Sequence, residues 1–253
     1  MPSQALSSLK QQTGRDSFDE FLKSQGNGVQ LYRAIWNENN LKHKVVVSEN
    51  GALVKAEEEI TQDSLPSKVL QATHQRFANA GELRIQKELF TVYDIKDNDT
   101  KEHFHVTADG RTLTKDIKNK RSPIAVDQIP QTALNALKVF SSNAKIEDAF
   151  TKNENGVNIY GIHWTRNGVR RSALVLENGF YVKAEIDLNA DQVPAYIKSL
   201  AASHYGNKTD LSYQQETVLT YEIKPVNAPK GNDRFRLAPS GAKVKVEDIS
   251  AGK

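Results

Sequence analysis

Apolar residues recur at helical spacing in four stretches of the chain, and each stretch begins at a proline that follows an apolar residue. The four prolines are Pro2, Pro66, Pro130 and Pro194. Proline is favoured at the first helical position because its φ is fixed and it has no N–H to leave unpaired. The pattern predicts four helices, and we expect Gly14, Gly81 and Gly206 to end three of them.

The segments between these stretches alternate apolar and polar residues, which is typical of strands. In the first quarter the alternation predicts strands at about 16–22, 29–37, 41–48 and 52–60. Asn50-Gly51, Asp109-Gly110 and Asn178-Gly179 can supply the positive φ that tight hairpins need. The predicted fold class is α+β, with helices packed on one face of antiparallel sheets.

The chain is an internal duplication. A shift of 128 residues aligns 1–96 with 129–224 without a gap and gives 28 identities in the 96 aligned pairs. The prolines divide each half again, because they are spaced by 64 residues. We therefore predict two domains, 1–126 and 127–253, each made of two tandem α-β4 units.

The duplication also separates predicted core from predicted surface. Tyr32 and Trp36 recur as Tyr160 and Trp164, on the same side of their predicted strands, whereas the residues on the opposite side differ between the copies. The repeated aromatic residues are therefore interpreted as core. Stacking of a ligand on the two Trp residues is the alternative.

Three segments carry a family resemblance: the helix start at 65–69 (LPSKV), the strand at 91–95 (TVYDI) and the turn at 108–113 (ADGRTL). Together they resemble the PepSY-like, β-lactamase-inhibitor-like domains of bacterial exported proteins. The resemblance implies a repeated unit of one helix and four strands, whose sheet offers a broad surface to another protein. It provides no catalytic residues, and it implies a periplasmic or extracellular location after removal of a leader.

Composition removes several classes of protein. With 34 Lys and Arg against 31 Asp and Glu, and with acids interleaved among the basic clusters, a nucleic-acid partner is not expected. No apolar run is long enough to span a bilayer. Cysteine is absent, which excludes disulfides and thiol chemistry. No nucleophile elbow, HExxH or phosphate-loop motif occurs, so neither an enzyme nor a cofactor is predicted.

Two sets of residues are candidates for a site. Because specificity should lie where the two copies differ on the outward sheet face, Arg33, Ile35, His163, Arg170 and Arg171 are predicted to contact a partner, with Ile35 exposed beside Arg33 as a modest apolar patch.

His103 and His105 are the best metal-ligand candidates in the sequence, since residues i and i+2 of a strand point to the same face. No third ligand is identifiable from the sequence. Two solvated histidines are the favoured interpretation, so no metal is predicted, and a metal site is the alternative. The second half has Arg236 in place of His105, so such a site would be an acquired one.

The predicted function is that of a non-enzymatic, exported binding protein that engages or inhibits another protein through its sheet surface. The alternative is a structural component of the cell envelope or of an extracellular assembly, in which the duplicated units associate laterally. The sequence leaves the partner and the oligomeric state open.

Overall fold

The computed structural model describes residues 1–115, 120–206, 208–227 and 235–248. The α-helices within these residues are α1 (Ser3–Thr13), α2 (Ser67–Arg76), α3 (Gln131–Phe140) and α4 (Ala195–Tyr205). Each begins directly after one of the four prolines, so the predicted starts are correct to within one residue. The prolines are the N-cap residues, with ψ angles of 138° to 145°, and not the first helical residues. Gly14 follows α1 with a φ of 67° and Gly206 follows α4 with a φ of 70°, so both predicted ends are confirmed. The predicted end at Gly81 is wrong, because α2 ends at Arg76 and Phe77 already leaves the helix.

Strands make up most of the remaining structure. The strands of the first half are β1 (Glu20–Gly26), β2 (Val29–Glu38), β3 (Leu41–Ser48), β4 (Leu53–Ile60), β5 (Leu83–Asp97), β6 (His103–Thr107), β7 (Arg111–Lys115) and β8 (Ser122–Ile124). Those of the second half are β9 (Asp148–Glu154), β10 (Val157–Arg166), β11 (Val169–Leu176), β12 (Tyr181–Leu188), β13 (Leu211–Pro225), β14 (Phe235–Leu237) and β15 (Val244–Asp248). Two short 3₁₀ helices, Gln62–Ser64 and Val126–Gln128, precede α2 and α3.

β1 lies four residues later than the predicted strand at 16–22 because of the turn that joins it to β2. Gly26 pairs with Val29, so Asn27 and Gly28 form a two-residue loop. Their φ angles are 46° and 80°, and a tight hairpin needs positive φ at both loop positions. β2, β3 and β4 agree with the predicted segments to within one residue.

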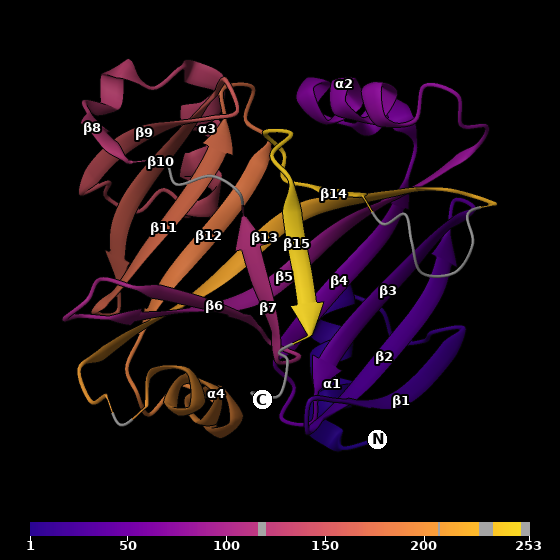
Figure 1. The fold of residues 1–253 in the computed structure, drawn as a ribbon, viewed down its shortest axis with the longest axis horizontal. Helices are drawn as coiled ribbons and strands as arrows, with labels where there is room; N and C mark the ends of the chain where they lie inside the picture. Colours follow the sequence, from indigo (N-terminus) through magenta and orange to yellow (C-terminus); the bar gives the residue numbers. More distant parts are fainter. Residues whose placement is uncertain (116–119, 207, 228–234, 249–253) are drawn as a thin grey trace.

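One antiparallel sheet joins both halves of the sequence, in the order β1-β2-β3-β4-β5-β13-β12-β11-β10-β9-β8 (Figure 1). A mixed fold with helices and an antiparallel sheet is therefore confirmed. At its centre Phe90 of β5 pairs with Val218 of β13, which is its own equivalent in the 128-residue repeat. The register is thus symmetric about this pair. The domain boundary at 126/127 stays a prediction, and the sheet is continuous from one half to the other.

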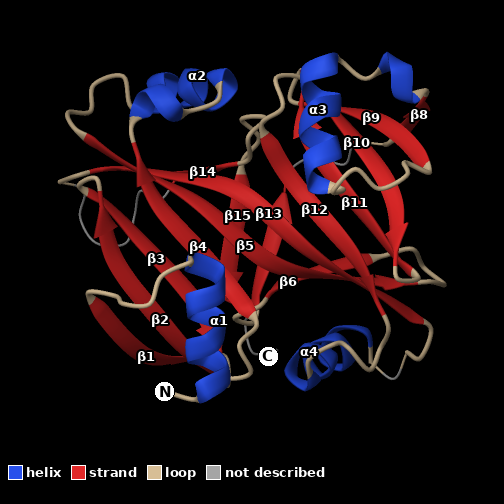
Figure 2. Cartoon of the chain, turned by 180° about the vertical axis from the view of Figure 1, so that it is seen from behind, coloured by secondary structure: helices blue, strands red, loops and turns tan. Residues whose placement is uncertain are grey.

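The two faces of the sheet carry different layers. The described α-helices lie on one face, which we call the helix face (Figure 2). β6, β7, β14 and β15 cross the opposite face, the front face, which is turned toward the viewer in Figure 1. β7 pairs with β15, and Thr114 lies opposite Lys245, its equivalent at a spacing of 131 residues. This ribbon covers Phe90, Val92 and Val218 at the centre of the front face.

α2 packs on strands from the second half of the sequence. Its buried Val69 belongs to a cluster that includes Tyr221 of β13 and Leu237 of β14. Phe77, just after the helix, meets Phe235 of β14 edge-on, with ring centroids 5.9 Å apart. These contacts place a first-half helix on second-half strands.

α4 makes the reciprocal contact with the first half. Ile197 packs with Tyr93 of β5 and Val106 of β6. Tyr205 meets Phe104 of β6 edge-on, with ring centroids 6.3 Å apart, and its hydroxyl donates to the carbonyl of Ile95 at 2.9 Å. The halves therefore exchange one helix each, and this exchange fixes the position of β6 and β14 over the front face.

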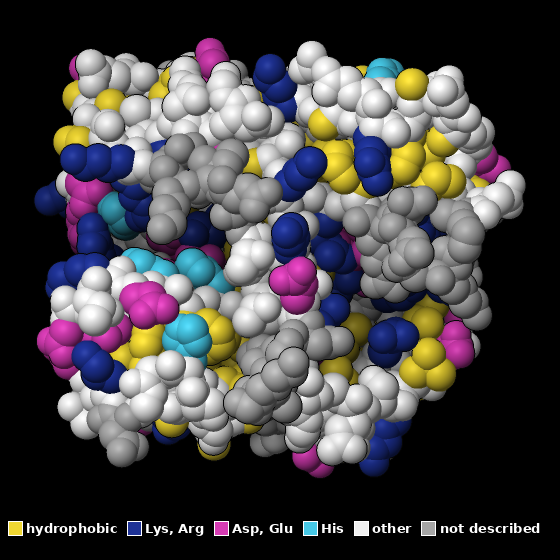
Figure 3. All heavy atoms as spheres, viewed as in Figure 1, with side chains coloured by type: hydrophobic (Ala, Val, Ile, Leu, Met, Phe, Trp, Pro, Cys, Tyr) yellow, Lys and Arg dark blue, Asp and Glu magenta, His cyan; other side chains and the backbone are white. Residues whose placement is uncertain are grey.

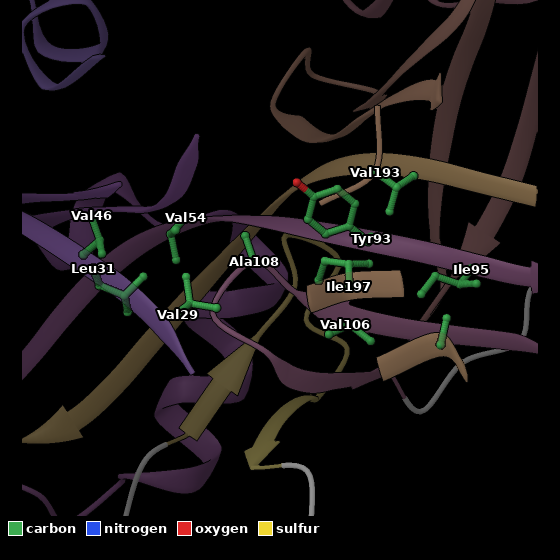
Figure 4. Packing of buried hydrophobic residues seen from close by; sticks show 11 residues of the cluster. Val29, Leu31, Val46, Val54, Tyr93, Ile95, Val106, Ala108, Val193 and Ile197 are labelled. Carbon is green, nitrogen blue, oxygen red and sulfur yellow. The ribbon is translucent and has the colours of Figure 1, made fainter. Parts of the chain in front are cut away.

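The core interpretation of the repeated aromatic residues is confirmed. Tyr32 and Trp36 pack with α1, while Trp164, together with Ile162, packs with α3. A further cluster bridges the first-half strands and α4. In Figure 4, Ala108 lies between a group containing Leu31, Val46 and Val54 and a group containing Tyr93 and Ile197.

Candidate functional site

The structure divides the residues predicted to contact a partner between the two faces of the sheet. Arg33, His163 and Arg170 lie on the front face. Arg171 alternates with Arg170 along β11 and lies on the helix side, together with Ala173, which packs with α3. The predicted set therefore does not form one continuous surface, and its role in binding stays a prediction.

The exposed apolar patch predicted at Ile35 does not form, because Ile35 is only 6 % exposed. β2 is paired on both sides, and the residues opposite Ile35 are Glu20 on β1 and Lys44 on β3. The aliphatic stems of such long side chains cover an apolar neighbour on the same face.

A cleft of about 300 Å³ opens on the front face beside Arg33. We call it the first-half cleft. Its charged wall consists of five basic residues and three acidic ones: Arg33, Lys44, Lys55, Arg111 and Lys224, with Glu57, Asp109 and Glu222. The cleft thus brings β2, β3 and β4 together with the β6–β7 hairpin and with β13, so neither half of the sequence forms it alone.

The carboxylates of the first-half cleft already have basic partners. Glu57 accepts from Lys44 at 2.7 Å and also pairs with Lys55. Burial alone would raise the pKa of Glu57, but the charges of Lys55 and Lys44 outweigh it and hold that pKa at about 2. Asp109 pairs with Arg111 at 2.7 Å, and this pair lowers the Asp109 pKa against the effect of burial. Arg33 has no ion-pair partner among the described residues.

A buried guanidinium lies behind the cleft. Arg236 of β14 donates from Nε to Glu88 at 2.6 Å and from Nη2 to Glu222 at 2.5 Å. All three side chains are buried. Burial would raise the pKa of Glu88, but Lys55 and Arg236 lower it, so the carboxylate is ionised. Arg236 also lies over the Phe90 ring, 5.3 Å from its centroid, and so carries a fixed cation to the centre of the molecule.

The second half repeats the carboxylates of this arrangement together with their lysine. Lys183 is the equivalent of Lys55, which pairs with Glu57 and Glu88. Glu216, the equivalent of Glu88, pairs with Lys183 at 2.5 Å. Glu185, the equivalent of Glu57, pairs with Lys183 at 2.7 Å and with Arg121 at 2.6 Å, and it accepts from Ser172 at 2.5 Å. Burial would raise the pKa of Glu185, but Lys183 and Arg121 together hold it far below its usual range.

Asp94, His103 and His105 lie close together on β5 and β6. We call them the histidine cluster. His105 stands at the position that Arg236 occupies in the other copy of the repeat. Asp94 lies opposite His105 in the β5–β6 register. Nδ1 of His103 is 2.9 Å from Asp94 Oδ1, and Nε2 of His105 is 3.6 Å from the same oxygen. The structure therefore places a carboxylate beside the two histidines, where the sequence identified no third candidate ligand. Histidine side chains gather on this part of the front face in Figure 3.

The remaining front-face histidine is held in a different way. His163 Nδ1 lies 2.5 Å from Asp148 Oδ1, and Arg170 reaches the other Asp148 oxygen at 3.2 Å. Arg121 approaches Nε2 of His163 at 3.4 Å. The predicted pair His163 and Arg170 is thus brought together by one carboxylate, far along the sheet from Arg33.

A larger hollow of about 800 Å³ lies on the helix face beside α1, and no ionisable side chain lines it. Gln12 and Leu53 line this hollow, whereas their equivalents in the other half are Phe140 and Tyr181, whose rings contact each other at 5.0 Å between centroids. Tyr181 donates to the Thr217 carbonyl at 2.6 Å and occupies the corresponding space. The hollow offers hydrogen-bonding groups but no charge with which to select a ligand.

Sequence reasoning missed Asp94, Glu88 and Glu222 as members of charged sites. The signal was present in the repeat, because the alignment places Asp94 opposite Glu222 and His105 opposite Arg236. The alignment does not show that Arg236 of the second half pairs with Glu88 of the first half.

No protein-family model matches the sequence, and its comparison with the curated proteins gives no match. The resemblance to PepSY-like domains therefore stays a hypothesis. Among the described helices, none has the length and apolar character needed to cross a membrane.

Proposed function

We propose that the chain is a non-enzymatic binding protein that engages an acidic segment of another protein through the first-half cleft. The observation that carries this proposal is the surplus of basic side chains in an open cleft: five line it, against three carboxylates. The carboxylates have partners, whereas Arg33 has none among the described residues. An unpaired guanidinium in a concave, partly desolvated site is suited to accept a carboxylate in a bidentate geometry.

The geometry of the first-half cleft suits an extended acidic segment better than a small neutral ligand. Arg33 lies on β2, Arg111 on β7 and Lys224 on β13, so the basic groups come from three separated elements around one opening. Charges distributed in this way steer an anionic partner and fix its register more than they add to raw affinity. Binding should therefore weaken strongly as salt concentration rises.

The remaining parts of the proposal depend on the sequence. The tandem α-β4 organisation, the PepSY-like relationship and the export to the periplasm or exterior follow from the repeat and from the resemblance. The helix-then-strands order of the elements supports the first of these. Inhibition of the partner would be one outcome of binding.

The test uses a fluorescein-labelled decamer of glutamate as the probe and fluorescence anisotropy as the measurement. We expect the Arg33→Glu variant to bind the probe at least about tenfold more weakly than the natural chain. Arg166→Glu is the matched control, because Arg166 is exposed at the end of β10 and has no ion-pair partner within the described ranges. Equal affinity of both variants, with unchanged circular dichroism, would contradict the proposal.

Lateral assembly is the second candidate function, and the edge strand β1 favours it. β1 ends the strand order, while its equivalent β9 is covered by β8. Phe21 and Leu22 on β1 are 48 % and 40 % exposed, and an open edge with exposed apolar residues can pair with another chain. Light scattering after size exclusion decides: mass that rises with concentration and returns to the monomer value in Phe21→Lys supports assembly, and a constant monomer mass excludes it.

A further inference from the structure

We propose that Asp94, His103 and His105 bind a divalent transition-metal ion of the zinc type. This inference is independent of the first-half cleft, because it concerns other residues on the opposite side of the β7–β15 ribbon. The ligand atoms of the three residues lie within 4.8 Å of one another. Tetrahedral zinc with bonds of about 2.0–2.1 Å needs ligand atoms roughly 3.4 Å apart, so small side-chain rotations complete the site.

The backbone prepares this geometry. His103 and His105 are separated by one residue on β6 and therefore point to the same face. Their rings are nearly parallel, with an interplanar angle of 15° and centroids 6.1 Å apart. Asp94 is buried on the neighbouring strand and lies nearest to the two ring nitrogens. Two imidazoles and one carboxylate, the carboxylate held by a rigid strand pair, form a three-ligand set that suits zinc and its neighbours.

The equivalent position in the other copy of the repeat has an arginine, which supplies positive charge without a metal ion. Glu222 and Arg236 are the equivalents of Asp94 and His105, and the Arg236 guanidinium bridges Glu222 and Glu88. In the histidine cluster His105 replaces the arginine, and a histidine is shorter and can be neutral. The carboxylates of Asp94 and Glu216 are kept. A divalent cation would supply the positive charge that arginine supplies in the other half.

The coordination would be incomplete from the protein side. Three protein ligands leave the fourth position of a tetrahedral ion open, and the exposed His103 places that position toward solvent on the front face. Water or a donor group of a partner would occupy it. Lys96, which pairs with His103 in the β5–β6 register, is the nearest basic residue along the strand on the same face as Asp94.

Zinc alone is the probe, measured by isothermal titration calorimetry, and cobalt provides an absorption band of the bound ion as a second readout. We expect one zinc ion per chain, and at least tenfold weaker binding in the His103→Ala/His105→Ala double variant. His105→Arg should also lose zinc while it keeps its folded circular dichroism, because it restores the arrangement of the other half.

His204→Ala is the matched control. His204 pairs with one carboxylate, Glu102, at 3.2 Å and stacks on Phe104, which points to the opposite side of β6. The zinc affinity of the His204→Ala variant should equal that of the natural chain. Absence of zinc heat and of a cobalt band in the natural chain, or equal affinity in the double variant, would overturn the proposal.

Discussion

The charged sites around Glu88 and around its equivalent Glu216 occupy corresponding positions in the repeat but balance their buried charge with different groups. Both bury a strand carboxylate beside the centre of the sheet, Glu88 in one and Glu216 in the other. Both sites have a lysine on their carboxylates, Lys55 in one and its equivalent Lys183 in the other. They differ in the second cation. One site has the buried guanidinium of Arg236, whereas the other has the two histidines of β6 in that part of the repeat. The duplicated framework thus keeps the acids and one lysine, and only the second cation varies between the halves. A change of this cation, from arginine to histidine, can give the site a new chemical property.

The largest effect should come from removing the fixed cation. In Arg236→Met, Glu88 and Glu222 lose their shared partner, and breaking a buried pair of this kind costs about 3–5 kcal/mol. His105→Ala should cost less than about 1 kcal/mol, because its side chain is partly exposed and exposed pairs are weak. Urea unfolding measures both. Equal losses in the two variants would show that the two sites do not differ as described.

Acid should weaken the paired carboxylates of both halves. Glu57 has a folded pKa of about 2 against an ordinary value of 4.5. Its contribution to stability is therefore complete above pH 4.5 and is lost as the pH falls from 4.5 to 2, by about 3 kcal/mol in all. Unfolding free energy measured across that window should fall less steeply in Glu57→Gln. The same slope in variant and natural chain would contradict the assignment.

A smaller effect should distinguish the two exchanged helices. The hydroxyl of Tyr205 donates to the Ile95 carbonyl, whereas its equivalent, Phe77, has no hydroxyl. Tyr205→Phe makes the two contacts chemically alike and should cost about 1 kcal/mol. Amide hydrogen exchange along α4 should accelerate by a corresponding factor of about 5. Unchanged exchange would mean that ring packing alone holds α4 in place.

Local features of the fold were accessible from the sequence because they depend on short-range chemistry. Each proline stands directly before its helix, and Gly51, Gly110 and Gly179 take the positive φ expected in the predicted turns. These effects act within a few residues, as does the apolar alternation that indicated the buried sides of β2 and β10. Gly81 misled the prediction because Phe77 leaves α2 early to reach Phe235 on a distant strand. Tertiary packing overrode a local stop signal there.

The candidate sites depended on contacts that one-dimensional patterns do not contain. His103 and His105 were visible as a pair, but the carboxylate that completes the histidine cluster, Asp94, lies on the neighbouring strand, nine residues before His103. Arg33 was found through divergence between the copies, and Ile35 by the same reasoning was placed at the surface wrongly. Divergence shows that a position is free to change. It does not show how well long neighbouring side chains cover it.

The exchange of α2 and α4 has a consequence for how the chain folds during synthesis. β5 pairs with β13 at the centre of the sheet, and the paired residues are on the order of a hundred positions apart in the sequence. β5 therefore emerges from the ribosome well before its partner strand. Contacts of such high sequence separation slow folding. Until β13 is made, β5 presents an unpaired strand edge and α2 has no second-half strands to cover. The nascent first half is therefore a species that a holding chaperone should recognise.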